Sequence, residues 1–446
     1  MKELDLTQGS VPKVLLQFAV PFLIANVLQA LYGGADLFVV GQYDDSASVA
    51  AVAIGSQVMQ TITGIILGIT TGTTVLIAIA TGAKDNRKVA FTIGSSVWLF
   101  SITGVVLTLV MVLFHSRIAE LMHTPVEAMI DTKNYILVCS LGILFIVGYN
   151  VVCGILRGLG DSKTPLYFVG LACVINIVLD FILVGYFHWG ATGAAIATVT
   201  AQGVSFGIAL WFLYRHGFHF DFSRKDIRLN RNLSKKILVL GAPIALQDAL
   251  INVSFLIITV IVNQMGVIAS ASLGVVEKII VFAMLPPMAI SSAVATMTAQ
   301  NYGAGLIKRM NKCLASGIGI ALVFGVSVCV YSQFLPETLT AIFTKDAAVV
   351  AMAADYLRGY SIDCIVVSFV FCINSYFSGQ GNSLFPMIHS LIATFLFRIP
   401  LSYWFSQMDS SSLFIMGFAP PISTVVSLLI CIWYLRYTQR KLYLRG

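Results

Sequence analysis

The sequence predicts an all-α membrane protein whose twelve transmembrane helices form two six-helix lobes, related by pseudo-two-fold symmetry along the membrane normal. Three observations predict this fold class. The 446 residues are 58% hydrophobic and only 11% charged, a balance typical of membrane-spanning proteins. The apolar residues form continuous runs, such as 97–114 and 317–330, whereas a membrane β-barrel would alternate apolar and polar residues. The two halves of the chain also repeat one pattern.

Each apolar run is long enough to cross a bilayer as a helix, which needs about 20 residues. Polar, glycine-rich or proline-containing stretches separate the runs. Several runs exceed the minimum length, so tilted or bent helices are expected, and Pro286 and Pro287 are expected to break or bend the eighth span. We expect the spans at 14–41, 47–80, 89–114, 128–153, 165–187, 191–214, 234–264, 268–300, 309–333, 347–376, 384–406 and 412–435.

The basic residues predict the orientation of these spans. If both termini are cytoplasmic, 21 of the 27 Lys and Arg residues fall in cytoplasmic segments, and the external loops hold only Arg117 and Lys345. Such asymmetry is the positive-inside pattern of multi-pass proteins of the cell membrane. The net charge of +7 therefore reflects topology and contact with the lipid bilayer, and nucleic acid is not an expected partner.

The chain matches itself at a shift of 221 residues. RGLGDS at 157–162 meets SGQGNS at 378–383, TGAK at 81–84 meets YGAG at 302–305, and Tyr135 meets Tyr356. Pro21 meets Pro243 at a shift of 222. Each half holds an even number of spans, so both share one topology, with a cavity expected between them. We expect an N-lobe at 1–214, a basic cytoplasmic linker at 215–233 and a C-lobe at 234–446.

Polar residues within the first half form a candidate ion site. Asn26, Gln29 and Asp36 share one face of the first span, and Tyr32 lies one turn before Asp36. Asn176 and Asp180 share a face of the fifth span. Two carboxylates and neighbouring oxygens could bind a hard monovalent cation or hold a proton. Alternatively, Asp36 is solvated at the outer membrane surface, and Asn176 and Asp180 make structural hydrogen bonds between helices.

The second half does not repeat this chemistry, because Asn176 becomes Phe397 and Asp180 becomes Leu401 at the same shift. It has candidates of its own, which could form either a neutralised structural ion-pair network or a transport site: Glu277, Asp363 and Arg398.

Pro21 lies within the first span and predicts either a fixed kink or a hinge whose bending responds to protonation of Asp36. Enzyme and cofactor motifs are absent from the sequence. GLGDSKT at 158–164 lacks the spacing of a phosphate-binding loop. We expect no enzymatic activity, no cofactor and no metal beyond a possible Na⁺, so energy must come from an ion gradient.

These residues resemble the multidrug and toxic compound extrusion (MATE) family over essentially the whole chain. The resemblance rests on Pro21 with LYGGADLFVVGQ at 31–42, TGAKD at 81–85, RGLGDSKTP at 157–165 and GAPIALQ at 241–247. It implies twelve helices in two lobes around a central cavity. It also implies antiport by alternating access, in which cationic or amphiphilic drugs and other toxic organic compounds leave in exchange for H⁺ or Na⁺. A monomer is expected.

Within the family, the chain resembles the DinF-like branch more than the NorM-like branch. The resemblance assigns the cation or proton site of that branch to Asp36, Asn176, Asp180 and Thr198. It places Gln29, Tyr32 and Tyr135 around this site, with Asn26 and Asn150 as further candidates for the supporting network or substrate cavity, and makes Pro21 the hinge. NorM-like members carry a Glu in the seventh helix, where this chain has Ile251-Asn252.

Two other functions remain open at this point. The first is a lipid-linked oligosaccharide flippase of the same superfamily, a class that tends to have fourteen spans and a cationic cavity. The second is a channel without stoichiometric coupling.

Overall fold

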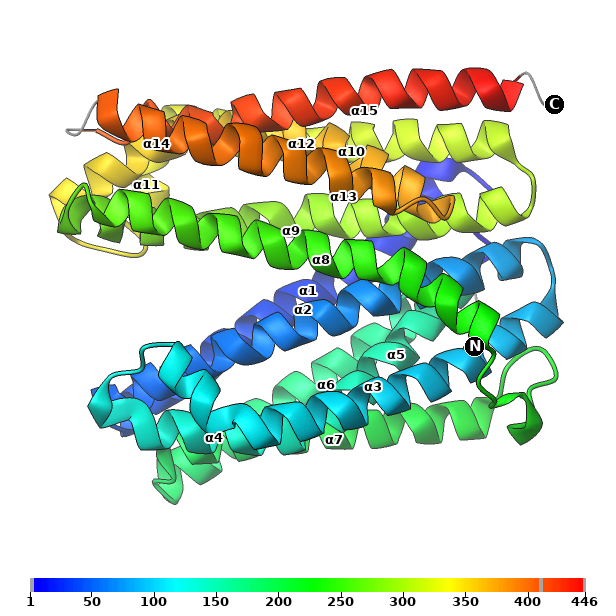
Figure 1. Cartoon of the computed structure of the whole chain (residues 1–446), viewed down its shortest axis with the longest axis horizontal. Coiled ribbons are helices and arrows are strands. Elements are labelled where there is room, and N and C mark those ends of the chain that lie inside the picture. Colours follow the sequence, from blue (N-terminus) through cyan, green and yellow to red (C-terminus); the bar gives the residue numbers. More distant parts are fainter. Residues whose placement is uncertain (1–3, 409–411, 444–446) are drawn as a thin grey trace. The chain divides into compact units, whose positions relative to one another are not determined.

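In the computed structural model, residues 4–408 and 412–443 are described, and they form helices and loops without strands (Figure 1). The α-helices are α1 (Val11–Tyr43), α2 (Ser46–Gly82), α3 (Asn86–Leu121), α4 (Met129–Leu141), α5 (Ile143–Leu159), α6 (Lys163–Asp180), α7 (Gly190–His216), α8 (Arg231–Asn263), α9 (Val267–Gly303), α10 (Ile307–Phe334), α11 (Pro336–Thr340), α12 (Ala347–Gly379), α13 (Leu384–Leu391), α14 (Ile399–Met408) and α15 (Ala419–Tyr443). Short 3₁₀ or π segments are η1 (Val126–Ala128), η2 (Phe181–Tyr186), η3 (Arg224–Asp226), η4 (Ile392–Arg398) and η5 (Met416–Phe418).

The described helices confirm the predicted fold class. Eleven are long and apolar enough to cross a membrane, or twelve if one bent pair is counted as a span. That pair is 126–141 with 143–159, bent by 49° at Gly142, where one span at 128–153 was expected. A Cβ at Gly142 would lie 2.6 Å from the Val199 side chain, so the chain breaks where α7 approaches closely.

Proline does not interrupt the long helices. α1 continues through Pro21, and α9 continues through both Pro286 and Pro287. The eighth span is therefore not broken at these prolines, and a bend there stays a prediction. Membrane helices tolerate proline because neighbouring helices and polar side chains satisfy the backbone groups that the missing hydrogen bond leaves free.

Aspartate side chains fix the starts of three long helices. Asp45 accepts a hydrogen bond from the Ser48 amide at 2.8 Å, and Asp85 accepts one from the Lys88 amide at 2.9 Å. Asp346 starts α12 in the same way. Each cap satisfies an amide that the helix itself leaves unpaired, and the negative charge interacts favourably with the helix dipole.

The internal repeat is visible in the backbone of the turns. Lys84 and Gly305, which are 221 residues apart, both have a left-handed backbone conformation, with φ of 55° and 72°. Gly160 and Gly381 are left-handed too, at 99° and 86°, with the same separation. The same closing hydrogen bond, from an amide to the carbonyl five residues earlier, follows in all four turns: Asp85 to Ala80, Leu306 to Asn301, Asp161 to Leu156 and Asn382 to Phe377.

The described residues divide into two compact units. Unit 1 holds residues 4–6, 20–245 and 303–305, and unit 2 holds 7–19, 246–302, 306–408 and 412–443. Three helices contribute to both units, although α9 does so only through its last residue, Gly303. α1 changes unit between Ala19 and Val20, next to Pro21, and α8 changes between Ala245 and Leu246, shortly after Pro243.

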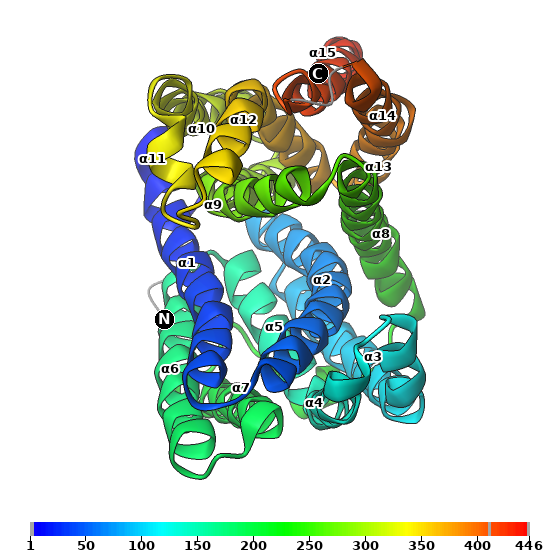
Figure 2. The same ribbon diagram turned by 90° about the vertical axis from the view of Figure 1, so that its left-hand side faces the viewer.

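Two helices organise the packing of unit 1, and one helix organises that of unit 2. In unit 1, α2 packs against α3, α4 and α5, while α7 packs against α4, α5 and α6. In unit 2, α12 packs against α10 and α15 (Figure 2). Glycine allows the close packing of α5 on α2, because a Cβ at Gly158 would lie 2.8 Å from the Thr74 carbonyl oxygen. These contacts position the polar residues described next.

Candidate functional site

Three helices of unit 1 bring the four predicted site residues together. Asp36 lies on α1, Asn176 and Asp180 on the last turns of α6, and Thr198 on α7. The Thr198 hydroxyl donates to Asp36 Oδ2 at 3.1 Å, and Asn176 Nδ2 lies 3.5 Å from Thr198 Oγ1. The carboxyl groups of Asp36 and Asp180 lie next to each other. We call these four residues the acid cluster.

Three residues of the acid cluster are buried, and Thr198 is half-buried. Asp36 is 4% exposed, and Asn176 and Asp180 are 0% exposed. Asp36 is therefore not simply solvated at the membrane surface, which was one of the two alternatives. The other alternative, structural hydrogen bonding between helices, is met by Asn176, which donates to Thr198 on α7 at 3.5 Å, but not by Asp180, whose two oxygens lack a hydrogen-bond partner.

Four oxygen atoms of the cluster are buried without a donor: Asp36 Oδ1, Asn176 Oδ1 and both carboxylate oxygens of Asp180. Burying unpaired polar atoms is costly, and two adjacent carboxylates repel each other when both are ionised. A proton shared by the carboxyls would remove this cost, and so would a hard monovalent cation held by the oxygens. The cluster is thus chemically suited to bind a small cation.

A π-helical segment begins directly after the cluster. Asp180 ends α6, and η2 follows at Phe181–Tyr186. Widened turns of this kind are rare and frequently occur at functional sites. No sequence pattern indicated this segment, because its residues (FILVGY) read as an ordinary apolar helix.

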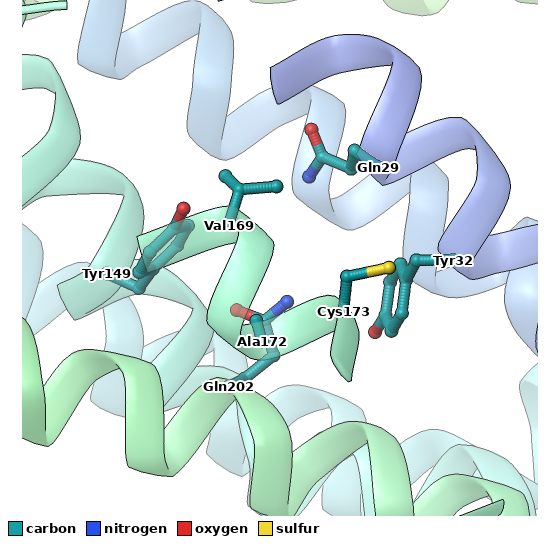
Figure 3. A pocket seen from close by; sticks show the side chains of 7 residues that line it. All are labelled: Gln29, Tyr32, Tyr149, Val169, Ala172, Cys173 and Gln202. Carbon is teal, nitrogen blue, oxygen red and sulfur yellow. The ribbon is translucent and has the colours of Figure 1, made fainter. Parts of the chain in front are cut away.

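A small pocket lies in unit 1 near the cluster (Figure 3). α1 contributes Gln29 and Tyr32, both of which the sequence predicted. The Tyr32 side chain contacts Thr198 of the cluster. The other lining residues come from α5, α6 and α7: Tyr149, Val169, Ala172, Cys173 and Gln202.

Gln202 is the functional candidate that sequence reasoning missed. Its Oε1 is buried without a hydrogen-bond partner, and its side chain contacts Tyr32. A signal for it was present, since Gln202 follows Thr198 by four residues and therefore lies on the same face of α7.

The remaining first-half candidates lie outside the hydrogen bonds of the cluster. Tyr135 is buried, and its hydroxyl pairs with Ser56 Oγ at 3.1 Å. Asn150 donates to the Ile146 carbonyl of its own helix at 2.8 Å. Within residues 4–408 and 412–443, no hydrogen bond joins Asn26 to the cluster. Pro21 is buried within α1, four turns before Asp36.

The second-half candidates do not form the ion-pair network that the sequence suggested as one alternative. Glu277 lies on α9, Asp363 on α12 and Arg398 at the end of η4. The ion pairs among the described residues involve Glu120, Glu337 and Asp355, so none joins these three candidates. The guanidinium of Arg398 instead lies over the ring of Phe255, 4.2 Å from its centroid.

A family profile described as MatE matches the chain twice, at residues 21–182 and 243–404. The matched segments start at residues 21 and 243 and therefore reproduce the internal repeat. Together they cover more than half of the chain, one match in each half.

Several curated relatives align along most of their length. The chain is 29% identical to the probable multidrug resistance protein YpnP of Bacillus subtilis, covering 91% of both chains. It is 28% identical to the probable multidrug resistance protein NorM of Thermotoga maritima, covering 88% of this chain and 85% of the relative. The multidrug export protein MepA of Staphylococcus aureus is 26% identical, covering 83% and 82%.

Solved structures show the same fold. The chain matches crystal structures of MATE in the straight and in the bent conformation, each with a TM-score of 0.92. Sequence identities are 24% and 23%, and at least 99% of each chain is covered. With the family profile matching both halves and the fold matching throughout, this chain belongs to the MATE family of multidrug efflux transporters.

Proposed function

We propose that this chain is a secondary antiporter that exports cationic or amphiphilic organic compounds in exchange for H⁺ or Na⁺. The observation that carries the proposal is the buried pair of carboxyl groups at Asp36 and Asp180, with oxygen atoms that lack donors. Relatives named as multidrug resistance or export proteins support the substrate class. Members of this family are transporters rather than enzymes, and they need no cofactor.

The coupling follows from differential binding by two conformations. A cation or proton that enters the acid cluster neutralises its negative charge. The neutral cluster attracts a cationic substrate less strongly and favours the conformation that releases it. An ion gradient can drive export only through such a difference in affinity between the two states. The pocket lined by Gln29, Tyr32 and Gln202 offers polar groups along a route to the cluster.

We further propose that Pro21 is the hinge of α1. Proline removes a backbone hydrogen bond and weakens a helix locally. Its position supports this role, because α1 changes from unit 2 to unit 1 between Ala19 and Val20. Charge at Asp36, four turns further along α1, would then bias the bending of the helix.

The broader setting is proposed from the sequence. We assign the protein to the cell membrane with both termini in the cytoplasm, as the distribution of basic residues favours. The functional lobes are 1–214 and 234–446, joined by the linker 215–233. The DinF-like branch is favoured by the carboxylates of the first half and by Ile251-Asn252 at the NorM-like Glu position. The protein acts as a monomer.

Substitution of the two carboxylates tests the proposal. Asp36→Asn and Asp180→Asn are expected to abolish efflux of a cationic dye such as ethidium from vesicles with an imposed Na⁺ or pH gradient, one gradient at a time. Each change removes one ionisable group and keeps the side-chain shape. The matched control is Asp221→Asn, because Asp221 is exposed in the linker and its loss should leave efflux unchanged.

Full gradient-driven efflux by both cluster variants would contradict the proposal. Dye that only equilibrates across the membrane, regardless of either gradient, would instead indicate a channel. A wild-type protein that moves lipid-linked oligosaccharide and ignores the dye would indicate the flippase alternative.

A further inference from the structure

Arg398 of unit 2 is an arginine in the middle of a membrane span without an ionic partner. Residues 384–408 form one candidate span, and Arg398 lies roughly 20 Å along it at 1.5 Å per residue. Charged side chains at this depth are costly, and they normally pair with another group or serve transport. Among the described residues, none forms an ion pair with Arg398 within 4.0 Å.

The N–H donors of the Arg398 guanidinium lack acceptors among the described residues. No described side chain or carbonyl accepts a hydrogen bond from it, and its Nε is buried without a partner. The guanidinium carbon, Cζ, lies over the face of the Phe255 ring, 4.2 Å from the ring centroid. The contact with Phe255 holds the guanidinium in place, and its N–H groups form a fork that matches the two oxygens of a carboxylate.

Carboxylates of the protein lie near Arg398 but make other contacts. Glu277 is close enough to interact electrostatically with Arg398, yet it accepts a hydrogen bond from Thr259 at 3.5 Å. Asp363 also lies within electrostatic reach; it is 4% exposed, and its Oδ1 has no hydrogen-bond partner. If Glu277 and Asp363 served only to neutralise Arg398, at least one of them would be expected to form an ion pair with it.

A polar face of α8 borders this group. Asp248, Asn252, Phe255 and Thr259 follow one another at intervals of four, three and four residues, so they share one face of the helix. Asp248 and Asn252 are exposed, and Phe255, Glu277 and Arg398 are half-buried. An exposed carboxylate within a membrane span must border water or a polar ligand rather than hydrocarbon. Arg398 therefore lies beside a face that a ligand can reach.

From this arrangement we infer that Arg398, held on Phe255, is a binding subsite for the acidic group of the substrate, and that unit 2 selects zwitterions that carry a carboxylate and an ammonium group. The carboxylate pairs with the guanidinium, and the ammonium lies toward Glu277 and Asp363. Compared with a plain cation, a zwitterion gains the pair with Arg398, whereas a plain anion would be repelled by the two acids. The inference rests on the proposed export function and names its substrate class.

The π segment η4 supports a functional role for Arg398. η4 spans Ile392–Arg398 and ends at this residue, as η2 begins directly after Asp180 in unit 1. The subsite belongs to the second half alone, because Arg398 corresponds to Ile177 and Phe255 to a glycine at the repeat shift.

The test uses rhodamine B, a zwitterion with a free carboxylate, and its ethyl ester, which is a plain cation on the same scaffold. Binding of each dye to the purified full-length protein is measured by fluorescence anisotropy. Arg398→Gln is expected to weaken binding of the free acid about tenfold or more, the scale of a charge-assisted bidentate pair, while binding of the ester stays unchanged or tightens. Arg398→Lys should fall between, because it keeps the charge and loses the fork.

Arg358→Gln is the matched control, since Arg358 already pairs with Glu337 at 2.7 Å and with Asp355 at 3.2 Å. It should leave the ratio of the two affinities unchanged. If Arg398→Gln does not fold, Phe255→Leu is the alternative variant. It keeps the charge of Arg398, removes the aromatic ring beneath it and should weaken binding of the free acid relative to the ester.

Equal loss of both dyes, an unchanged ratio, or failure of the wild type to bind the free acid would overturn the inference. Failure of the antiport proposal is distinguishable, because the binding assay needs no gradient. Asp36→Asn should stop gradient-driven efflux and leave the ratio of the two affinities intact.

Discussion

At the residue scale, the acid cluster depends on a few oxygen atoms whose roles can be separated. The carboxylates supply charge, whereas Thr198 supplies a neutral hydroxyl that donates to Asp36 at 3.1 Å. The Thr198 oxygen also remains available as a ligand for a cation. We therefore propose that the hydroxyl tunes the affinity of the cluster for the coupling ion without contributing to its charge.

Thr198→Val removes this hydroxyl at nearly constant shape. The hydrogen bond from Thr198 stabilises the ionised form of Asp36 by about 1.5–3 kcal/mol. If H⁺ is the coupling ion, the H⁺ concentration for half-maximal efflux is therefore expected to fall roughly tenfold. If Na⁺ is the coupling ion, the valine variant loses an oxygen ligand, and the Na⁺ concentration for half-maximal efflux is expected to rise. Thr198→Ser restores the hydroxyl and should largely restore the wild-type affinity. Titration of dye efflux against the driving ion in proteoliposomes measures the shift. Equal half-maximal concentrations for the valine variant and the wild type would contradict this role.

The sequence predicted the residues of the cluster better than their surroundings. Asp36, Asn176 and Asp180 were identified because charged and amide groups are rare in apolar runs, and Thr198 followed from the family resemblance. Gln202 was missed, although its spacing from Thr198 places both on one face of α7. The absence of an Arg398 ion pair could not be predicted, because sequence shows that opposite charges exist and does not show which way their side chains turn.

At the element scale, two segments differ from the continuous helices that the sequence indicated. The fourth span is broken at Gly142, where α7 packs closely. The fifth span widens into a π segment after Asp180. In both cases tertiary packing decides the local geometry, whereas hydrophobic patterning predicts only that a helix is present. The continuous course of α9 through Pro286 and Pro287 has the same cause.

Close packing of α5 on α2 gives a test of unit 1 as an element. A Cβ at Gly158 would lie 2.8 Å from the Thr74 carbonyl oxygen and 2.9 Å from Ile77 Cβ, so Gly158→Ala should force the helices apart. Overpacking of this kind costs about 1–3 kcal/mol, and the midpoint of thermal unfolding in detergent should fall. Gly207→Ala is the control, because nothing lies within 4 Å of its added Cβ. Equal midpoints for the two variants would contradict the packing.

At the scale of the whole molecule, one duplicated scaffold carries two different kinds of chemistry. The turns at Lys84 and Gly305, and at Gly160 and Gly381, keep the same backbone in both halves. The polar residues do not repeat, since the acid cluster belongs to the first half and Arg398 with Phe255 to the second. Because the scaffold is duplicated, the fold could be predicted from the match of the chain with itself at a shift of 221 residues. Because the polar residues have diverged, the sites could be described only from the positions of their side chains.

Because the polar residues differ between the two halves, the proposed ion coupling depends on the acid cluster alone. If the coupling ion and a cationic substrate compete through the charge of the cluster, each must weaken binding of the other by the same factor. That reciprocity follows from equilibrium thermodynamics and does not depend on which conformations are involved.

The most direct test is therefore the affinity of the purified protein for ethidium as Na⁺ replaces choline at constant ionic strength, and separately as the pH is lowered. The account predicts that one of the two ions weakens dye binding to the wild type, and that Asp36→Asn and Asp180→Asn remove this dependence. A wild-type affinity that responds to neither ion, or a response that persists in both variants, would contradict it.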